Sequence, residues 1–419
     1  MAQTGDWVTP RLWGKPWFEK PPLLYWTTAV AFKAGLDSGL APRLPVALIS
    51  VAFLIYFFVA LGRQFGELAA FYATTILATS AGWLAYSHVA VTDLPMSAAF
   101  AAAMLTVIGD VDPSRSRRGY GGSIGAGILL GLAVLAKGLV PIALFIPAIW
   151  FLRGRIRELW VIFGVAAVVA APWYVLVLWR NGAPFIDVFF VQQTFGRFAS
   201  KALGHDQPFW FYLPILLAGL FPWTPFLALL FQKRVYADRR ACFLLTWILW
   251  CLVFFSVFLN KLPGYLLPIL PAAAALFGIS IASATERSKK ITFLIAVSAA
   301  LLWFIPAIQE LLPQALLSGI SHAPIELPRG WILPLAVAIL CALLEWTGRR
   351  TSALAFLGLV TALSVVRLVQ VVYPILDERY SARGFWISHR GAITCVPKES
   401  RAQRYGLDYY AERDLPNCN

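Results

Sequence analysis

Charged side chains are scarce in this 419-residue chain. Only 13% of its residues are Asp, Glu, Lys or Arg, whereas 59% are hydrophobic, and the mean hydropathy is +0.71. A soluble chain of this length would be expected to form about two or three domains with polar surfaces. The composition excludes that class and predicts a membrane protein of several helices. A β-barrel is disfavoured, because the apolar runs are continuous and do not alternate with polar residues.

Cysteine is also rare, and several sequence motifs are missing. The five cysteines include no CxxC pair and show no Cys/His spacing typical of zinc sites. No Gly-rich phosphate loop, internal repeat or low-complexity tract is present. The Gly-rich segment 120–127 opens an apolar run and indicates close helix packing rather than nucleotide binding. Three cysteines lie inside apolar runs, whereas Cys395 and Cys418 lie in the polar tail and can form a disulfide if that tail is extracytoplasmic.

Acidic residues are outnumbered by basic ones, 21 to 35, which gives a net charge of +14. On a soluble protein this charge would indicate nucleic acid. Here most of the excess lies in short links between apolar runs, where Lys and Arg hold loops in the cytoplasm. We therefore expect a membrane environment and no nucleic-acid partner. The alternate links, together with both ends of the chain, are then extracytoplasmic: 88–92, 180–210, 260–263 and 307–330.

The apolar runs define the expected domains. A transmembrane helix needs roughly 20 apolar residues, and residues 22–36 form a shorter helix that is more typical of the membrane interface. We predict an extracytoplasmic loop and interfacial helix over 1–41, a transmembrane domain over 42–373 and a small extracytoplasmic tail domain over 374–419. About twelve runs are expected to span the membrane: 42–62, 68–87, 93–109, 120–136, 138–152, 159–178, 211–231, 241–259, 264–283, 290–306, 331–347 and 352–372.

A few ionisable residues fall on the expected outer face. Such groups are costly at membrane depth and are commonly functional. Several also have a plain structural explanation: Asp93 as a helix N-cap, Lys137 and Lys261 as interfacial anchors, and Glu19 with Lys20 as an exposed ion pair. Their convergence on one face favours a functional site. The set comprises Glu19, Lys20, Asp93, Lys137, Arg197, His205 and Lys261.

Several segments resemble one known family. The chain is similar to the polyprenyl-phosphate-dependent GT-C glycosyltransferases, nearest to the lipid A aminoarabinose transferases and the protein O-mannosyltransferase-like bacterial proteins. This resemblance implies an all-α polytopic bundle. The family's first helix and its catalytic Asp would lie before Met1, so we expect a truncated start that leaves the chain without its main carboxylate. The resemblance rests, in order, on GDWVTPRL with FEKPPLLYW, TDLPM, GLAVLAKGLVP, GRFASKALGHDQPFWFYLP and NKLPGYLLPILPA.

The resemblance also implies a reaction. A sugar would move, with inversion, from a polyprenyl-phosphate-linked donor to a lipid A-like lipid, glycan or protein outside the inner membrane of a bacterium. Asp93 is expected as a supporting carboxylate. Cations would stabilise the leaving phosphate, and Glu19 with His205 could ligate a divalent ion such as zinc, magnesium or manganese. The expected phosphate-binding residues are Lys20, Arg197, Lys137 and Lys261.

Two other classes remain open. A lipid or sugar transporter would show polar residues near the bilayer midplane and broken helices in symmetric halves. The sequence instead concentrates its polar residues on the outer face and shows no such symmetry. A non-catalytic membrane subunit is the second alternative, because the expected catalytic Asp is not in the chain.

Overall fold

The computed structural model describes residues 1–112, 119–195, 207–285, 287–318, 332–379, 381–389, 393–396 and 401–418. Within these ranges the chain forms two compact units, Met1–Leu294 and Ile295–Asn419. The division falls inside α15, Lys289–Leu301, whereas the boundary predicted at residue 373 falls inside α18, Arg350–Arg379. The three-part domain division inferred from composition therefore stays a prediction.

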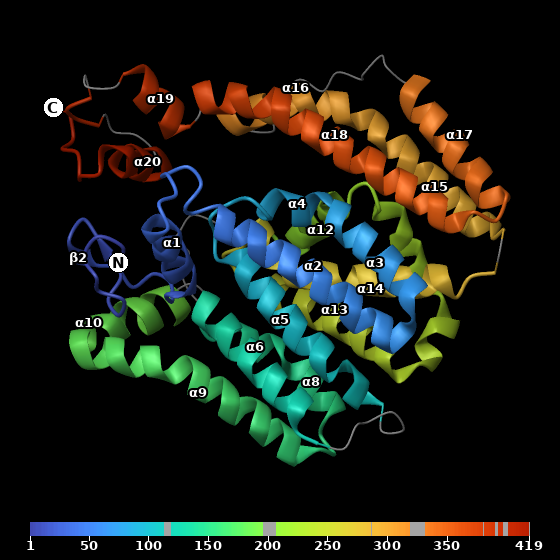
Figure 1. Cartoon of the computed structure of the whole chain (residues 1–419), viewed down its shortest axis with the longest axis horizontal. Coiled ribbons are helices and arrows are strands. Elements are labelled where there is room, and N and C mark those ends of the chain that lie inside the picture. Colours follow the sequence, from blue (N-terminus) through green and yellow to red (C-terminus); the bar gives the residue numbers. More distant parts are fainter. Residues whose placement is uncertain are drawn as a thin grey trace. The chain divides into compact units, whose positions relative to one another are not determined.

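The first unit is a helical bundle preceded by a short β-hairpin (Figure 1). Its strands pair antiparallel, with Leu12 opposite Lys15. The elements, apart from α15, are β1 Arg11–Leu12, β2 Lys15–Pro16, α1 Leu23–Lys33, α2 Leu44–Phe65, α3 Glu67–Thr79, α4 Ala81–Tyr86, α5 Asp93–Val107, η1 Ile108–Val111, α6 Gly121–Lys137, α7 Val140–Leu144, α8 Ile146–Phe151, α9 Ile156–Asn181, α10 Ala183–Phe185, η2 Ile186–Phe195, η3 Phe209–Phe211, α12 Tyr212–Gly219, η4 Thr224–Phe231, η5 Lys233–Ala237, α13 Arg239–Val257, η6 Pro263–Ile269 and α14 Leu270–Ala282.

Two helices form the centre of this bundle. In α5 and in the segment from η6 through α14, 78% and 89% of the apolar window is buried, against 28% in both α2 and α9. Helix α5 packs between α2 and α6, and α6 in turn packs against α9 (Figure 1). Small side chains permit this packing, because a Cβ atom at Gly127 of α6 would lie 2.7 Å from the carbonyl oxygen of Ile162 in α9. Within the Gly-rich segment 120–127, Gly127 therefore lies in a helix-packing surface, whereas Gly121 is exposed and a Cβ atom there would meet nothing within 4 Å.

The helices differ from the expected spans in several places. By length and composition, seven helices among the described residues can cross a membrane, or eight if one bent pair is a single span, so the count of about twelve is not confirmed. Pro141 and Pro147 each start a short helix, so the run 138–152 forms α7 and α8 instead of one span. The run 211–231 is bent by 111° between α12 and η4.

Two expected loops contain helices. The link 180–210 begins with the end of α9 and continues through α10 and the π-helix η2, whose apolar sequence IDVFFVQQTF favours helix over solvated loop. The described part of the link 307–330 belongs to α16, Ile305–Ser318. Charge counting assigned these links to the extracytoplasmic set, but it carries no information on their local backbone structure.

Charged residues form contacts at both ends of the first bundle, and different residues do so at each end. At one end, Arg155 at the start of α9 contacts Asp110 after α5 at 2.7 Å, and Arg240 of α13 donates to the backbone of Gln64 in α2. These residues belong to or adjoin links expected in the cytoplasm. Asp93 and Lys137 lie at the opposite ends of α5 and α6. The helix ends therefore group as the positive-inside count predicts.

The second unit consists of helices with a small disulfide-linked segment at the C-terminal end. Its elements are η7 Leu302–Phe304, α16, α17 Ile332–Trp346, α18, α19 Ala382–Ser388 and α20 Arg401–Ala411. Val396, Leu407 and Leu415 form a small core near the chain end. The structure joins Cys395 and Cys418 in a disulfide across 23 residues, and Cys242, Cys251 and Cys341 are free thiols.

We expect Cys395 and Cys418 to be protected from alkylation under denaturing, non-reducing conditions. Three thiols should then be labelled, and five after reduction, as counted by intact-protein mass spectrometry. The other cysteines serve as the internal control for complete labelling. Closing a loop of this size stabilises the folded segment by about 3 kcal/mol, so reduction should also increase cleavage of the tail by protease. Five labelled thiols without a reductant would exclude the disulfide.

Candidate active site

The site centres on an ion pair between two helix ends. Asp93 is the first residue of α5 and Lys137 the last residue of α6, and their Oδ1 and Nζ atoms are 2.6 Å apart. The side chains are only 17% and 8% exposed. Each charge also complements the dipole of its own helix, negative at an N-terminus and positive at a C-terminus. The N-cap of α5 is Thr92, so the simple N-cap explanation of Asp93 does not describe the structure.

A third segment packs directly against this ion pair. Tyr265 at the start of η6 places its ring centroid 4.3 Å from the Lys137 ammonium, in a cation–π contact. At Gly264 a Cβ atom would lie 2.8 Å from both Asp93 Oδ1 and Tyr86 Cε1. Only glycine therefore allows the backbone of η6 to approach so closely. We call Tyr86, Asp93, Lys137, Gly264 and Tyr265 the polar cluster.

The predicted cation Lys261 has a different environment. Its side chain is buried, and its ammonium donates to the backbone carbonyl oxygen of Gln207 at 2.9 Å and to that of Phe258. It thereby fastens the segment before α12 to the end of α13. In this structure Lys261 links these two segments, and its role in phosphate binding stays a prediction.

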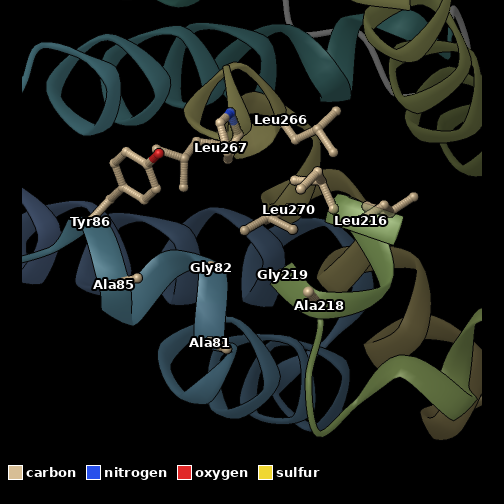
Figure 2. Close-up of a pocket in the computed structure, with 12 residues that line it drawn as sticks. Ala81, Gly82, Ala85, Tyr86, Leu216, Ala218, Gly219, Leu266, Leu267 and Leu270 are labelled. Carbon is tan, nitrogen blue, oxygen red and sulfur yellow. The ribbon is translucent and has the colours of Figure 1, made fainter. Parts of the chain in front are cut away.

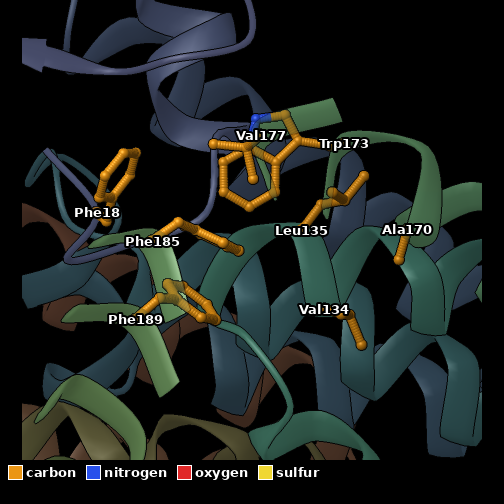
Figure 3. Packing of buried hydrophobic residues seen from close by; sticks show 8 residues of the cluster. All are labelled: Phe18, Val134, Leu135, Ala170, Trp173, Val177, Phe185 and Phe189. Atoms are coloured by element: carbon orange, nitrogen blue, oxygen red, sulfur yellow. The ribbon is translucent and has the colours of Figure 1, made fainter. Parts of the chain in front are cut away.

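The loop that carries Glu19 and Lys20 is anchored by the residue before them. Phe18 is 4% exposed and belongs to an apolar cluster with side chains of α6, α9, α10 and η2 (Figure 3). Its ring lies 5.3 Å from that of Phe185. The same cluster includes Leu135, two residues before Lys137. Glu19 and Lys20 are both half-buried and directly follow Phe18 in the chain. Their backbone therefore begins near the end of α6 that carries Lys137.

Glu19 also influences a neighbouring phenol. Burial, together with the negative charge of Glu19, raises the pKa of Tyr25 to about 12. Tyr25 is therefore neutral at physiological pH. The predicted partner of Glu19 in a metal site, His205, lies outside the described residues, as does Arg197. Within the described ranges there is no group of three or more His, Cys, Asp or Glu side chains that could hold a metal ion.

An apolar cavity of about 250 Å³ adjoins the polar cluster (Figure 2). Its walls come from α4, α12 and the segment η6–α14, and Tyr86 belongs both to the cavity wall and to the polar cluster. Neither this cavity nor Tyr86 is predicted by the sequence, because Tyr86 lies in no recognisable motif. Gly264 and Tyr265 lie in the segment NKLPGYLLPILPA, of which only Lys261 was a predicted site residue. The remaining walls are mainly small or aliphatic, including Ala81, Gly82, Leu216, Gly219 and Leu270.

Comparisons with known proteins define the class. A family model described as dolichyl-phosphate-mannose-protein mannosyltransferase matches residues 19–179. The fold is similar to the crystal structure of ArnT from Cupriavidus metallidurans bound to undecaprenyl phosphate, with a TM-score of 0.76 and 26% identity, over 99% of this chain and 78% of that chain. The apo structure of the same protein gives a TM-score of 0.78. The chain is thus a polytopic membrane protein with the GT-C fold.

Sequence relatives narrow the family. The chain is 32% identical to the undecaprenyl phosphate-alpha-4-amino-4-deoxy-L-arabinose arabinosyl transferase of Serratia proteamaculans, over 66% of this chain and 52% of that protein. It is 34% identical to the transferase of the same name from Yersinia enterocolitica, over 69% of this chain and 54% of that protein. The chain belongs to the polyprenyl-phosphate-dependent GT-C glycosyltransferase family. It spans about half the length of these curated relatives.

The Asp93–Lys137 ion pair predicts how the stabilities of single and double variants should compare. Asp93→Leu or Lys137→Met alone should lower the free energy of unfolding by about 3 kcal/mol, because each leaves a buried charge without its partner. The double variant should lose less than the sum of the single losses. Thermal unfolding in detergent measures both quantities. Additive losses would show that the two side chains do not stabilise each other.

Proposed function

We propose that this chain is a membrane glycosyltransferase that moves a sugar from a polyprenyl-phosphate-linked donor to an extracytoplasmic acceptor. The observation that carries this proposal is that the Asp93–Lys137 pair, an apolar cavity and Phe18, which precedes Glu19 and Lys20 in the chain, lie around one end of the bundle. An anionic lipid donor needs both cations and hydrocarbon-lined space. The names of the relatives favour 4-amino-4-deoxy-L-arabinose as the group transferred, and the expected acceptor remains a lipid A-like lipid, a glycan or a protein.

The expected chemistry is a single displacement. A hydroxyl or amine of the acceptor attacks the anomeric carbon, the bond from that carbon to the phosphate oxygen breaks, and polyprenyl phosphate leaves as an anion. A carboxylate close to the acceptor takes the proton. Attack from the side opposite the leaving group inverts the anomeric carbon. Cations fixed near the phosphate stabilise the charge that develops on its oxygens.

The described residues divide this work in a particular way. Lys20 is the strongest candidate for the phosphate, because its loop is anchored by Phe18 at the end of the bundle that carries Asp93 and Lys137. Asp93 is the supporting carboxylate. It holds the Lys137 ammonium in place through their ion pair, and it packs against the start of η6 at Gly264. Arg197 is proposed as a second phosphate ligand, and Lys137 and Lys261 as more distant contributors to the positive potential.

A divalent ion is not required by this scheme. The described ranges contain only Glu19 of the predicted pair Glu19 and His205, and they contain no cluster of three candidate ligands. The described residues therefore do not test this metal site, and the proposed reaction uses no metal ion. The ligand pair stays a prediction.

The proposed location is the inner membrane of a bacterium, with the site on the extracytoplasmic side. Two observations support it. The Arg-rich helix ends lie at the end of the bundle opposite Asp93, as expected for a cytoplasmic face. The sequence relatives are bacterial proteins whose names include undecaprenyl phosphate.

Lys20→Ala should reduce sugar transfer about 10²- to 10³-fold, because the leaving phosphate loses a fixed cation. Transfer is measured with the full chain in vesicles, using an undecaprenyl-phosphate-linked aminoarabinose donor and lipid A. The matched control is Lys15→Ala, which removes an exposed lysine of the same loop and should leave the rate within a factor of about two, since an exposed, distant charge is largely screened. Membrane insertion should be unchanged in both variants.

The outcomes separate the candidate functions. Unchanged turnover in Lys20→Ala would remove the phosphate role. If the unsubstituted chain binds donor but transfers no sugar to any acceptor, the non-catalytic subunit is favoured. Movement of intact lipid or sugar across the vesicle membrane without transfer would favour a transporter.

A further inference from the structure

The first loop is a folded element rather than an extended connection. Trp13 and Gly14 have φ angles of 50° and 78°, which form the tight turn between β1 and β2. The amide of Trp17 donates to the carbonyl oxygen of Pro10 at 2.8 Å, and Arg11 donates to the carbonyl oxygen of Gly14. Residues 6–17 therefore form a compact hairpin that enters the FEKPP segment at a fixed place. We refer to this element as the N-terminal hairpin.

A turn at Asp6 shapes the base of the N-terminal hairpin. Asp6 Oδ1 accepts from the amides of Val8 at 3.0 Å and Thr9 at 3.1 Å, and from Arg180 Nη1 at 3.0 Å. Arg11 lies 3.7 Å from the other carboxylate oxygen. Burial alone would raise the pKa of Asp6, but the two amides and the two arginines lower it below its usual value. Asp6 is therefore an ionised turn residue near neutral pH.

Partly buried hydrogen bonds then tie the hairpin to the end of α9. Thr9 is 2% exposed, and its hydroxyl accepts from Asn181 Nδ2 at 3.0 Å. Asn181 also donates to the carbonyl oxygen of Val177 at 2.9 Å, which fixes the orientation of its amide. Trp173 donates from Nε1 to the carbonyl oxygen of Val8 at 2.9 Å. These hydrogen bonds stabilise the hairpin more than the ion pair to Arg180 does, because the Arg180 side chain is 48% exposed.

A second set of contacts ties the same hairpin to α1. Trp26 donates from Nε1 to the carbonyl oxygen of Trp7 at 2.8 Å, and the Lys33 ammonium lies 5.1 Å from the centroid of the Trp7 ring. Glu19 and Lys20 lie between the hairpin and α1 in the chain. The chain is therefore held in place before and after Glu19 and Lys20. Phe18, on the N-terminal side, is buried in the apolar cluster of Figure 3, and α1, on the C-terminal side, is bonded to the hairpin.

We propose that Asp6, Thr9 and Asn181 form a latch that positions Lys20 on the phosphate of the lipid donor. These are positioning residues, because they act through the backbone of the loop and not on the reacting atoms. The proposal rests on the phosphate role of Lys20 in the proposed function. A displacement of about 1 Å at a charged contact can lower the rate of a bound reaction roughly 10²-fold. Neither the ion pair at Asp93 nor the apolar cavity requires these three residues.

The test is a double-mutant cycle with Lys20. Thr9→Val keeps the shape of the side chain but removes the hydroxyl that accepts from Asn181, and Asp6→Ala removes the turn acceptor. Each should lower kcat/KM for the undecaprenyl-phosphate-linked donor about 10-fold, with the KM for the acceptor unchanged. In the Lys20→Ala background the same substitutions should change kcat/KM less than about twofold, because there is no ammonium left to misplace.

Two controls distinguish positioning from general stability. Thr9→Ser restores a hydroxyl and should recover most of the donor kcat/KM. Asp37→Ala removes a turn of the same kind, in which Asp37 Oδ1 accepts from the amides of Gly39 and Leu40 at 2.6 and 2.9 Å. It should leave the kinetics unchanged, since Asp37 does not contact the N-terminal hairpin.

The results separate the two proposals. If Lys20→Ala retains full turnover, the phosphate role and the latch built on it both fail. If Lys20→Ala is impaired but Thr9→Val and Asp6→Ala lower kcat/KM equally in both backgrounds, only the latch is overturned. Unchanged kinetics in Thr9→Val and Asp6→Ala would overturn it as well. Thermal unfolding of each variant in detergent shows whether a lowered rate accompanies loss of the fold.

Discussion

The contact between Asp93 and Lys137 sets the geometry on which the site depends. The chain has few charges, and this pair is held at the adjoining ends of α5 and α6, with Nζ and Oδ1 2.6 Å apart. Withdrawing either charge from water is costly, and the cost is offset only while the partner is in place. The pair therefore fixes how far α5 and α6 can slide along each other. Gly264 then allows a third segment, distant in the sequence, to close over the pair.

The site consequently joins features that would be ineffective alone. The apolar cavity contains no charged group, yet one of its walls carries Tyr86 to the polar cluster. The FEKPP loop has little regular structure of its own, yet Phe18 and the N-terminal hairpin hold it against α6 and α9. The opposite end of the same bundle carries arginine pairs at Asp110 and Asp238 instead. The two ends of the bundle therefore differ in the charged residues that they carry.

Much of this fold could be predicted from the sequence, for a simple physical reason. An uninterrupted apolar run of about 20 residues has few alternatives to a helix in a membrane, and α2, α9 and α13 lie close to their expected ranges. The prediction was wrong where proline starts a new helix, as in 138–152, or where the chain bends sharply, as in 211–231. Hydropathy records the total apolar length but not the local backbone direction.

The site was predictable only in part. Asp93 and Lys137 were identified as candidates, because isolated charges in apolar surroundings are conspicuous. Their pairing was not predicted, since a linear pattern does not say which helix ends meet. Thr9 and Asn181 could not be identified as important from the sequence, because uncharged polar residues in loops and at helix ends are common. Their role depends on burial, which only the folded structure provides.

The central claim is that the phosphate of the donor lies at the Asp93 end of the bundle. The most direct measurement is photocrosslinking with an undecaprenyl phosphate that carries a photoreactive group on the isoprene unit next to the phosphate, followed by peptide mapping. We expect labelled peptides from 17–26, 81–93 and 258–270. Labelling concentrated near Asp110, Arg155 and Arg240, at the other end of the same helices, would contradict it.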